Sequence, residues 1–288
     1  MRKLNYELKN LCRHNQDGSF ATRAGRERTL SLIANELHEM GFRKMTAVSL
    51  KPKHVEGLVD YWKANNRSSG TIKNRMSCLR WWSQKINRSN VIAKSNDAYD
   101  IPKRQFATNT NKARDLPEAL LARIEDKNTF FSLQLQLLFG LRCEESIKFI
   151  ASFADQGDHL LLKSSWCKGG RKREIPISTS EQRTLLDAIH HHTGKGSLIP
   201  VEMSYKQQLD RFKHQCAKAG IDHVHGLRHA YAQSRYEELT GWKSPAQDGS
   251  CRRQLSLEQK AVDCEARLQI SRELGHERES VTTTYLGR

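Results

Sequence analysis

The closing stretch LGHERESVTTTYLGR holds a candidate nucleophile, because only three residues follow Tyr285. A terminal, lightly packed segment would let its phenol move into line with a substrate atom, whereas the plainer alternative is a ring that covers the end of a terminal helix. Upstream, the stretch HVHGLRHAYAQSRY places His225 and Arg228 at i and i+3, on one face of a helix start. Such a pair offers one anion both a planar guanidinium fork and a proton donor or acceptor. These residues together predict a nucleophile and an anion-binding pair.

Two further stretches carry cations that could serve the same site. LLFGLRCEESIKF puts Arg142 directly after an apolar helix and a glycine, with Glu145 one turn later. The pair is either a surface i,i+3 ion pair or an arginine aimed into a cleft by its carboxylate. Lys168 precedes Gly169 and Gly170 in the turn WCKGGR, where a lysine is either solvated or presented to a substrate. A last candidate, His276, lies in the ELGH turn.

The order of these candidates along the chain is more specific than any one of them: Arg142, Lys168, His225, Arg228, His276, Tyr285. The motifs GLRxxE, HxLRHAYA, and LGH followed nine residues later by tyrosine jointly resemble those of the tyrosine recombinases, the phage-integrase family. The match covers the whole second half of the chain through its ordered motifs. The helical, basic first part resembles the core-binding half of that family more loosely.

The resemblance implies a role for each residue. The two arginines would hold the nonbridging phosphate oxygens, while Tyr285 attacks the phosphorus and stores the bond energy as a phosphotyrosine. Lys168 would protonate the departing 5′ oxygen, and His225 would exchange the tyrosine proton or assist at the same phosphate. His276 would donate a hydrogen bond to that phosphate, with Glu145 as the supporting acidic residue. No metal, ATP or other cofactor is then required.

Charge along the chain points to a polyanionic partner. The formal net charge is +16, from 48 Lys+Arg against 32 Asp+Glu. Residues 1–112 hold 22 basic and 9 acidic residues, a net of +13, so the remainder carries 26 − 23 = +3. Nucleic acid is the commonest partner of such a basic segment. Residues 1–112 are therefore interpreted as a clamp that binds DNA phosphates. The nearly neutral remainder can bind an anion only through a few individually placed cations.

Hydrophobic periodicity predicts a mainly α (α+β) fold. Residues 1–95 read as a DNA-binding bundle of about four helices, with apolar stripes such as Leu30, Ile33 and Leu37. Residues 96–115 are polar and aperiodic and read as a basic interdomain linker. Residues 116–288 form the catalytic domain, whose one β signal is a pair of strands flanking the WCKGGR turn. The basic residues expected to contact DNA are Lys73, Arg75, Arg80, Lys103, Arg104, Lys112 and Arg114.

One segment departs from the compact members of the family. The interval between Arg228 and His276 is long, so residues 240–264 are interpreted as an inserted surface loop with a short helix. With so short a tail after Tyr285, this insert is hypothesised to replace part of the contact that a longer tail makes with a neighbouring protomer.

Several classes are excluded. No run of about 18 apolar residues predicts a transmembrane helix, and the N-terminus lacks the apolar stretch of a signal peptide. Seven scattered cysteines without a CxxC pair favour reduced thiols in a cytoplasm over a disulfide framework or a zinc ribbon. The run His190–His192 lacks a Cys or acidic partner at ligand spacing, so no metal site is expected.

These features predict a site-specific recombinase, the integrase of a mobile element or prophage, acting on double-stranded DNA sites. By family resemblance it would work as a homotetramer through a Holliday junction, with accessory DNA-bending or directionality proteins as further partners. Two alternatives stay open. A type IB topoisomerase would relax DNA through the same phosphotyrosine, and a non-catalytic regulator would use HGLRHAYAQSRY as a recognition helix.

Overall fold

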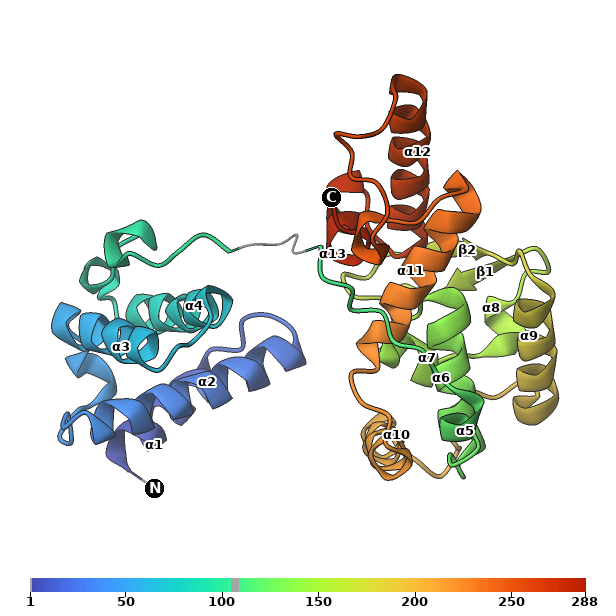
Figure 1. Cartoon of the computed structure of the whole chain (residues 1–288). Coiled ribbons are helices and arrows are strands. Elements are labelled where there is room, and N and C mark those ends of the chain that lie inside the picture. Colours follow the sequence, from blue (N-terminus) through green and yellow to red (C-terminus); the bar gives the residue numbers. More distant parts are fainter. Residues whose placement is uncertain (1, 105–108) are drawn as a thin grey trace. The chain divides into compact units, whose positions relative to one another are not determined.

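The computed structural model describes residues 2–104 and 109–288 (Figure 1). The chain folds into two compact units, Met1–Gln105 and Phe106–Arg288. Both units are built mainly from helices, and the strands of the described residues form one two-stranded sheet. The prediction of a mainly helical fold with a small antiparallel hairpin is therefore confirmed. No helix within the described ranges combines the length and apolarity that crossing a membrane requires.

The first unit is a bundle of four helices with one apolar core. Its helices are α1 (Lys3–His14), α2 (Phe20–Glu39), α3 (Pro52–Ala64) and α4 (Ser69–Lys85), with short 3-10 turns at Ala47–Ser49, Ser89–Val91 and Asp97–Tyr99. Ser19 and Ser68 cap the starts of α2 and α4 by accepting backbone N–H groups three residues on. The predicted apolar stripe on α2 is fully buried at Leu30, Ile33 and Leu37.

Two tryptophans and one ion pair fix the interior of this bundle. The indole N–H groups of Trp62 and Trp82 donate to Glu36 Oε2 at 2.8 Å and to the Ala47 carbonyl at 2.7 Å. Arg75 completes the Glu36 pair, with Nη1 2.8 Å from Oε1, and its guanidinium stacks over Trp62. A buried carboxylate needs such compensation, because an unpaired charge in an apolar core is strongly destabilising.

The second unit is a larger helical body. Its helices are α5 (Glu118–Leu121), α6 (Lys127–Phe139), α7 (Cys143–Ile147), α8 (Ala151–Ala154), α9 (Ser180–Thr193), α10 (Tyr205–Ala219), α11 (His225–Thr240), α12 (Leu257–Glu273) and α13 (Thr283–Leu286). Helix α11 packs against α6, α12 and α13 (Figure 1). Because these helices come from distant parts of the sequence, side chains on α11 can meet residues from both ends of the unit.

A single hairpin covers one side of this body. Strands β1 (His159–Leu162) and β2 (Arg173–Pro176) pair antiparallel, with Leu160 opposite Ile175 and Leu162 opposite Arg173. Alternation along β2 buries Arg173 and Ile175 while Glu174 faces solvent. The pairing matches the two β runs predicted from the sequence, and the connecting turn holds Gly169 and Gly170 at positive φ, 87° and 69°.

Two segments differ from their sequence interpretation. The expected linker, 96–115, begins inside the first unit, where Ile101 is buried in the core of the bundle; residues 105–108 lie outside the described part of the chain. The expected surface insert, 240–264, is not all surface. Ser244, Pro245 and Ala246 are buried, and residues 257–264 are the first two turns of α12.

Candidate active site

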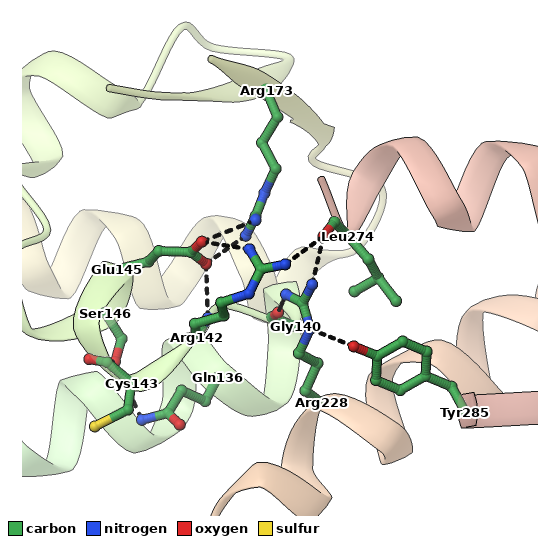
Figure 2. A network of polar contacts seen from close by, with 10 residues as sticks. All are labelled: Gln136, Gly140, Arg142, Cys143, Glu145, Ser146, Arg173, Arg228, Leu274 and Tyr285. Atoms are coloured by element: carbon green, nitrogen blue, oxygen red, sulfur yellow. Dashed lines mark hydrogen bonds and ion pairs between the residues drawn. The ribbon is translucent and has the colours of Figure 1, made fainter. Parts of the chain in front are cut away.

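Arg228 is the centre of the site. It lies in the first turn of α11 and is only 1% exposed. Its Nη1 donates to the Gly140 carbonyl, its Nη2 to the Leu274 carbonyl, and its Nε to the Tyr285 hydroxyl at 3.3 Å (Figure 2). Burial lowers the pKa of Arg228 to about 10, so the guanidinium stays charged at neutral pH. Within the described residues no carboxylate forms an ion pair with it.

Gly140 makes the first of these contacts possible. It ends α6 in the left-handed conformation, with φ 60° and ψ 27°, and this directs its carbonyl towards Arg228. A Cβ at this position would lie 2.5 Å from the Tyr231 ring, so only glycine fits. The GLR motif thus combines a helix end with the first site residue that follows it.

Arg142 is held beside Arg228 by a buried carboxylate. Its Nη1 and backbone N–H both donate to Glu145, each at 2.7 Å, and its Nη2 donates to the Leu274 carbonyl at 3.2 Å. Arg142 and Arg228 therefore share one backbone acceptor, which brings the two guanidinium groups together (Figure 2). The pair is not a surface ion pair, since Glu145 is fully buried.

Arg173 completes the ion pair and was missed in the sequence. Its Nη1 and Nη2 donate to the two oxygens of Glu145 at 2.9 and 2.6 Å, a bidentate contact between groups that are both almost fully buried. The pKa of Glu145 is lowered although burial opposes ionisation, because Arg173 and Arg142 stabilise its charge. The sequence did contain an indication that Arg173 is buried, because alternation in KREIPIS puts it on the same face of the strand as Ile175. A buried charge in turn requires an oppositely charged partner.

Tyr285 is packed and not loosely held. It is 7% exposed and Leu286 is fully buried, so the expectation of a lightly packed tail is corrected. Thr282 and Thr283 are buried too, because their hydroxyls donate to the carbonyls of Glu279 and Ser280, whereas Thr284 is exposed. The phenol nevertheless points towards Arg228, as the nucleophile interpretation requires (Figure 2).

Two histidines of α11 flank the tyrosine ring. The ring centroid of His225 lies 6.3 Å from that of Tyr285, and that of His229 lies 4.8 Å away. Burial, and then Arg228 and Arg142, lower the pKa of His225, so its imidazole is neutral at pH 7 and able to accept a proton. Burial lowers the pKa of His229 to about 4, helped by the neighbouring His225 and by the positive charges of Lys112 and Arg228. His229 follows Arg228 directly in the sequence, but the family resemblance assigned it no role.

His276 and Lys168 lie at the cationic edge of the site. Burial, followed by Arg142, Arg228, Arg173 and Lys168, lowers the pKa of His276 to about 4. The positive charge of Lys168 therefore acts on His276, although Lys168 itself is exposed on the hairpin turn. Among the described residues it makes no hydrogen bond to the other candidates. Direct contacts bring together five of the candidates, Arg142, Glu145, His225, Arg228 and Tyr285, whereas His276 and Lys168 are linked to them through charge alone.

Of the basic residues expected to bind DNA, Arg75 and Arg80 are engaged by partners within the first unit, and four others are exposed. The expectation that Arg75 binds DNA is wrong, because this residue is only 8% exposed and its guanidinium forms an ion pair with Glu36. Arg80 is half-buried and donates to the Ala93 carbonyl and the Asn96 side chain. The exposed group consists of Lys103, Arg104, Lys112 and Arg114, and Lys73 is half-buried.

The electrostatics of the site suit a phosphate. Arg142, Arg173 and Arg228 bring three positive charges and Glu145 brings one negative charge, which leaves 3 − 1 = +2 in the network of contacts that reaches the Tyr285 phenol (Figure 2). Residues 2–104 and 109–288 contain no group of three His, Cys, Asp or Glu side chains placed to hold a metal. Fixed guanidinium groups can supply the charge stabilisation that phosphoryl transfer requires.

Comparison with known proteins agrees with this geometry. The family description "Phage integrase, N-terminal" matches residues 1–92, and the description "Integrase" matches residues 105–234. No curated protein matches the chain by sequence.

Several solved structures share the fold. The Tn1549 transposon integrase in complex with circular intermediate DNA is 16% identical with a TM-score of 0.56, covering 100% of this chain and 96% of its own. A lambda integrase dimer bound to a COC′ core site is 15% identical with a TM-score of 0.61, covering 98% and 94%. A lambda integrase tetramer bound to a Holliday junction is 14% identical with a TM-score of 0.59, covering 97% and 76%.

The two family models together match residues 1–92 and 105–234, and they define an integrase, an enzyme that acts on DNA strands. The chain belongs to the tyrosine recombinase, or phage-integrase, family and is a site-specific DNA recombinase. The resemblance seen in the sequence is confirmed, as are the enzyme class and DNA as the partner.

Proposed function

We propose that Tyr285 is the nucleophile and that the enzyme cuts and rejoins DNA through a 3′-phosphotyrosyl intermediate. The phenol oxygen attacks the scissile phosphorus, a bond to phosphorus forms, and the bond to the 5′ oxygen breaks. Attack by a 5′ hydroxyl from another strand reverses the step and releases Tyr285. The covalent link conserves the bond energy, so the cycle requires no nucleotide cofactor.

The observation that carries this proposal is the buried charge of Arg228. Its three described partners are two backbone carbonyls and the Tyr285 hydroxyl, none of which neutralises a guanidinium. A buried charge without a counterion is costly, and a nonbridging phosphate oxygen would supply that counterion next to the phenol. Arg142 adds a second guanidinium, which donates to the same Leu274 carbonyl.

Proton movements are assigned to the neighbouring groups. The phenol proton goes to the neutral imidazole of His225, whose lowered pKa leaves it unprotonated at pH 7. Lys168 gives a proton to the departing 5′ oxygen, after the hairpin turn with its two positive-φ glycines brings it inward. His276 donates a hydrogen bond to the phosphate, and Glu145 keeps Arg142 in place.

The wider assembly follows the family. We place the first unit and the exposed cations Lys103, Lys112 and Arg114 on the phosphate backbone of the DNA, with the two units clamping the duplex. Four protomers on paired sites, meeting at a Holliday junction, perform strand exchange, because a lambda integrase with this fold forms such a tetramer. The chain acts in the cytoplasm on a mobile element or prophage, with DNA-bending or directionality proteins as partners.

Strand exchange on defined sites tests the proposal. Nicked duplexes of random sequence are incubated with the protein, and DNA that stays attached after denaturation is sequenced to define the site. Two labelled duplexes carrying that site should then yield recombinant strands, with Tyr285→Phe as the inactive control. Relaxation of supercoiled DNA without exchange would indicate a topoisomerase instead, and binding without attachment would indicate a regulator.

A further inference from the structure

The segment that leads into the second unit runs beside its catalytic helix. The Arg114 backbone N–H donates to the Gly226 carbonyl at 3.2 Å, in the first turn of α11. A Cβ at Gly226 would lie 2.8 Å from the Lys112 carbonyl and 2.3 Å from the Arg114 side chain. Glycine at this position therefore lets residues 109–114, here called the linker segment, lie close to the helix that carries His225 and Arg228.

The same segment contacts the residues that follow the tyrosine. The Asn109 side chain accepts the Arg288 backbone N–H at 2.8 Å and donates to the Arg288 carbonyl at 3.2 Å. A Cβ on Gly287 would lie 2.8 Å from the Asn109 side-chain oxygen and 2.9 Å from the Ala246 backbone nitrogen. Gly287 thus allows the linker segment and the 244–246 turn to close over the end of the tail.

A buried glutamine joins the linker segment directly to Tyr285. Gln233, on α11, is 2% exposed. Its amide donates to the Asn111 side-chain oxygen at 3.0 Å and to the Tyr285 carbonyl at 3.2 Å. The Asn111 oxygen also accepts the Ala113 N–H at 2.9 Å, which fixes its direction. Both protons of one buried amide are therefore used to connect the two segments.

We propose that the linker segment positions the nucleophile, with Asn109, Asn111 and Gln233 acting as a latch that sets Tyr285 against Arg228. Lys112 and Arg114 are exposed on this segment, so DNA phosphates can hold it from outside while Asn109 and Asn111 hold the tail from inside. Binding of DNA along the segment would thereby fix the phenol in its own protomer's site. The inference rests on the proposed role of Tyr285.

Removal of one hydrogen bond of the latch is expected to lower the rate of DNA cleavage without weakening DNA binding. The phenol contacts Arg228 at 3.3 Å, and the backbone that carries it is held by Gln233 and Asn109. Because misplacement of a reacting group by about 1 Å can cost roughly a hundredfold in rate, removal of one latch bond should slow cleavage about tenfold. Asn109, Asn111 and Gln233 are positioning residues and do not touch the reacting atoms.

The test compares Asn111→Ala with Asn111→Asp, which keeps the acceptor oxygen. Single-turnover cleavage of pre-bound DNA and the DNA dissociation constant are measured for each, with Lys112→Ala as the binding control. We expect Asn111→Ala to cleave about tenfold slower at unchanged affinity, Asn111→Asp to stay within about threefold of wild type, and Lys112→Ala to weaken binding. An unchanged rate in Asn111→Ala, or equal losses in both Asn111 variants, would overturn the latch.

A second measurement is independent of the chemistry. Amide hydrogen exchange in residues 283–288 should be at least about fivefold faster in Asn111→Ala than in wild type. The control is Asn128→Ala, which replaces an asparagine at the start of α6 that contacts His192 of α9, and it should exchange like wild type. If wild-type protein never attaches to DNA, the proposed function fails and this exchange result alone decides the latch. Unchanged exchange in the tail would reject it.

Discussion

The Nε of Arg228 donates a hydrogen bond to the hydroxyl of Tyr285 across 3.3 Å, joining residues 57 positions apart in the chain. The contact holds the phenol oxygen beside a buried positive charge. The same guanidinium is anchored by the carbonyls of Gly140 and Leu274, which fixes the direction of its Nε. The Tyr285 hydroxyl and the Arg228 guanidinium are thus held together as one preorganised unit.

Glu145 is predicted to support both structure and catalysis. In Glu145→Gln the fully buried carboxylate becomes a neutral amide, which leaves Arg142 and Arg173 without their shared counterion. Loss of one partner from a buried ion pair costs about 3–5 kcal/mol, so urea denaturation should show a decrease of that order in the free energy of unfolding. Cleavage should fall at least about tenfold as Arg142 loses its direction. Glu144→Gln on the exposed side of α7 is the matched control, and equal stability of the two variants would contradict this role.

Lys168 is predicted to act as the acid for the leaving group. Lys168→Ala should slow cleavage of ordinary DNA by about a hundredfold, which is within the usual contribution of general acid catalysis. A substrate with sulfur in place of the 5′ bridging oxygen needs little protonation, because a thiolate is a good leaving group. The variant should therefore cleave that substrate at nearly the wild-type rate. Equal defects on both substrates would show that Lys168 has another task.

Gly140 and Gly241 provide a matched pair at two helix ends. Both are left-handed C-caps, with φ 60° and 82°, but only Gly140 has a neighbour, the Tyr231 ring, within reach of an added Cβ. Gly241→Ala should lose only the conformational part, about 1 kcal/mol, whereas Gly140→Ala should lose about 2–4 kcal/mol of unfolding free energy through the added clash. Similar losses measured in the two variants would contradict the packing argument.

The buried histidines predict an acid-sensitive fold. The pKa of His229 and that of His276 are each lowered to about 4, chiefly by burial, whereas an unfolded histidine has a pKa of about 6.5. Between these values the unfolded state binds more protons, so the free energy of unfolding falls as pH decreases from about 6.5 to about 4 and is fully retained above that window. Urea denaturation across this range should show a shallower dependence in His229→Gln than in wild type. An unchanged pH slope in that variant would contradict the assignment.

Much of the site could be predicted because its residues lie in short local motifs. The spacing of His225 and Arg228 on one helix turn, and the glycine before Arg142, are local features that the sequence alone displays. The small hairpin could also be predicted, since its β-favouring runs flank two glycines in one turn.

The features that could not be predicted from the sequence depend on contacts between segments far apart in the chain. Arg75 follows the helical pattern of a surface cation, yet it is drawn inside because Glu36, 39 residues earlier, needs a counterion. Arg173 pairs with Glu145 across 28 positions, and the tail is packed because Arg267 donates to the Gly287 carbonyl at 3.0 Å. No pattern within one element reports such a partner.

The residue that becomes attached to DNA can be identified by mass spectrometry, and this shows whether Tyr285 is the nucleophile. A nicked duplex carrying the recombination site is incubated with the protein, the trapped complex is digested with protease and nuclease, and the modified peptide is sequenced by mass spectrometry. If Tyr285 is the nucleophile, a 3′-phosphonucleotide is found on Tyr285, and Tyr285→Phe shows no attachment although that variant still binds DNA. Attachment to another residue, or undiminished attachment in Tyr285→Phe, would contradict this role.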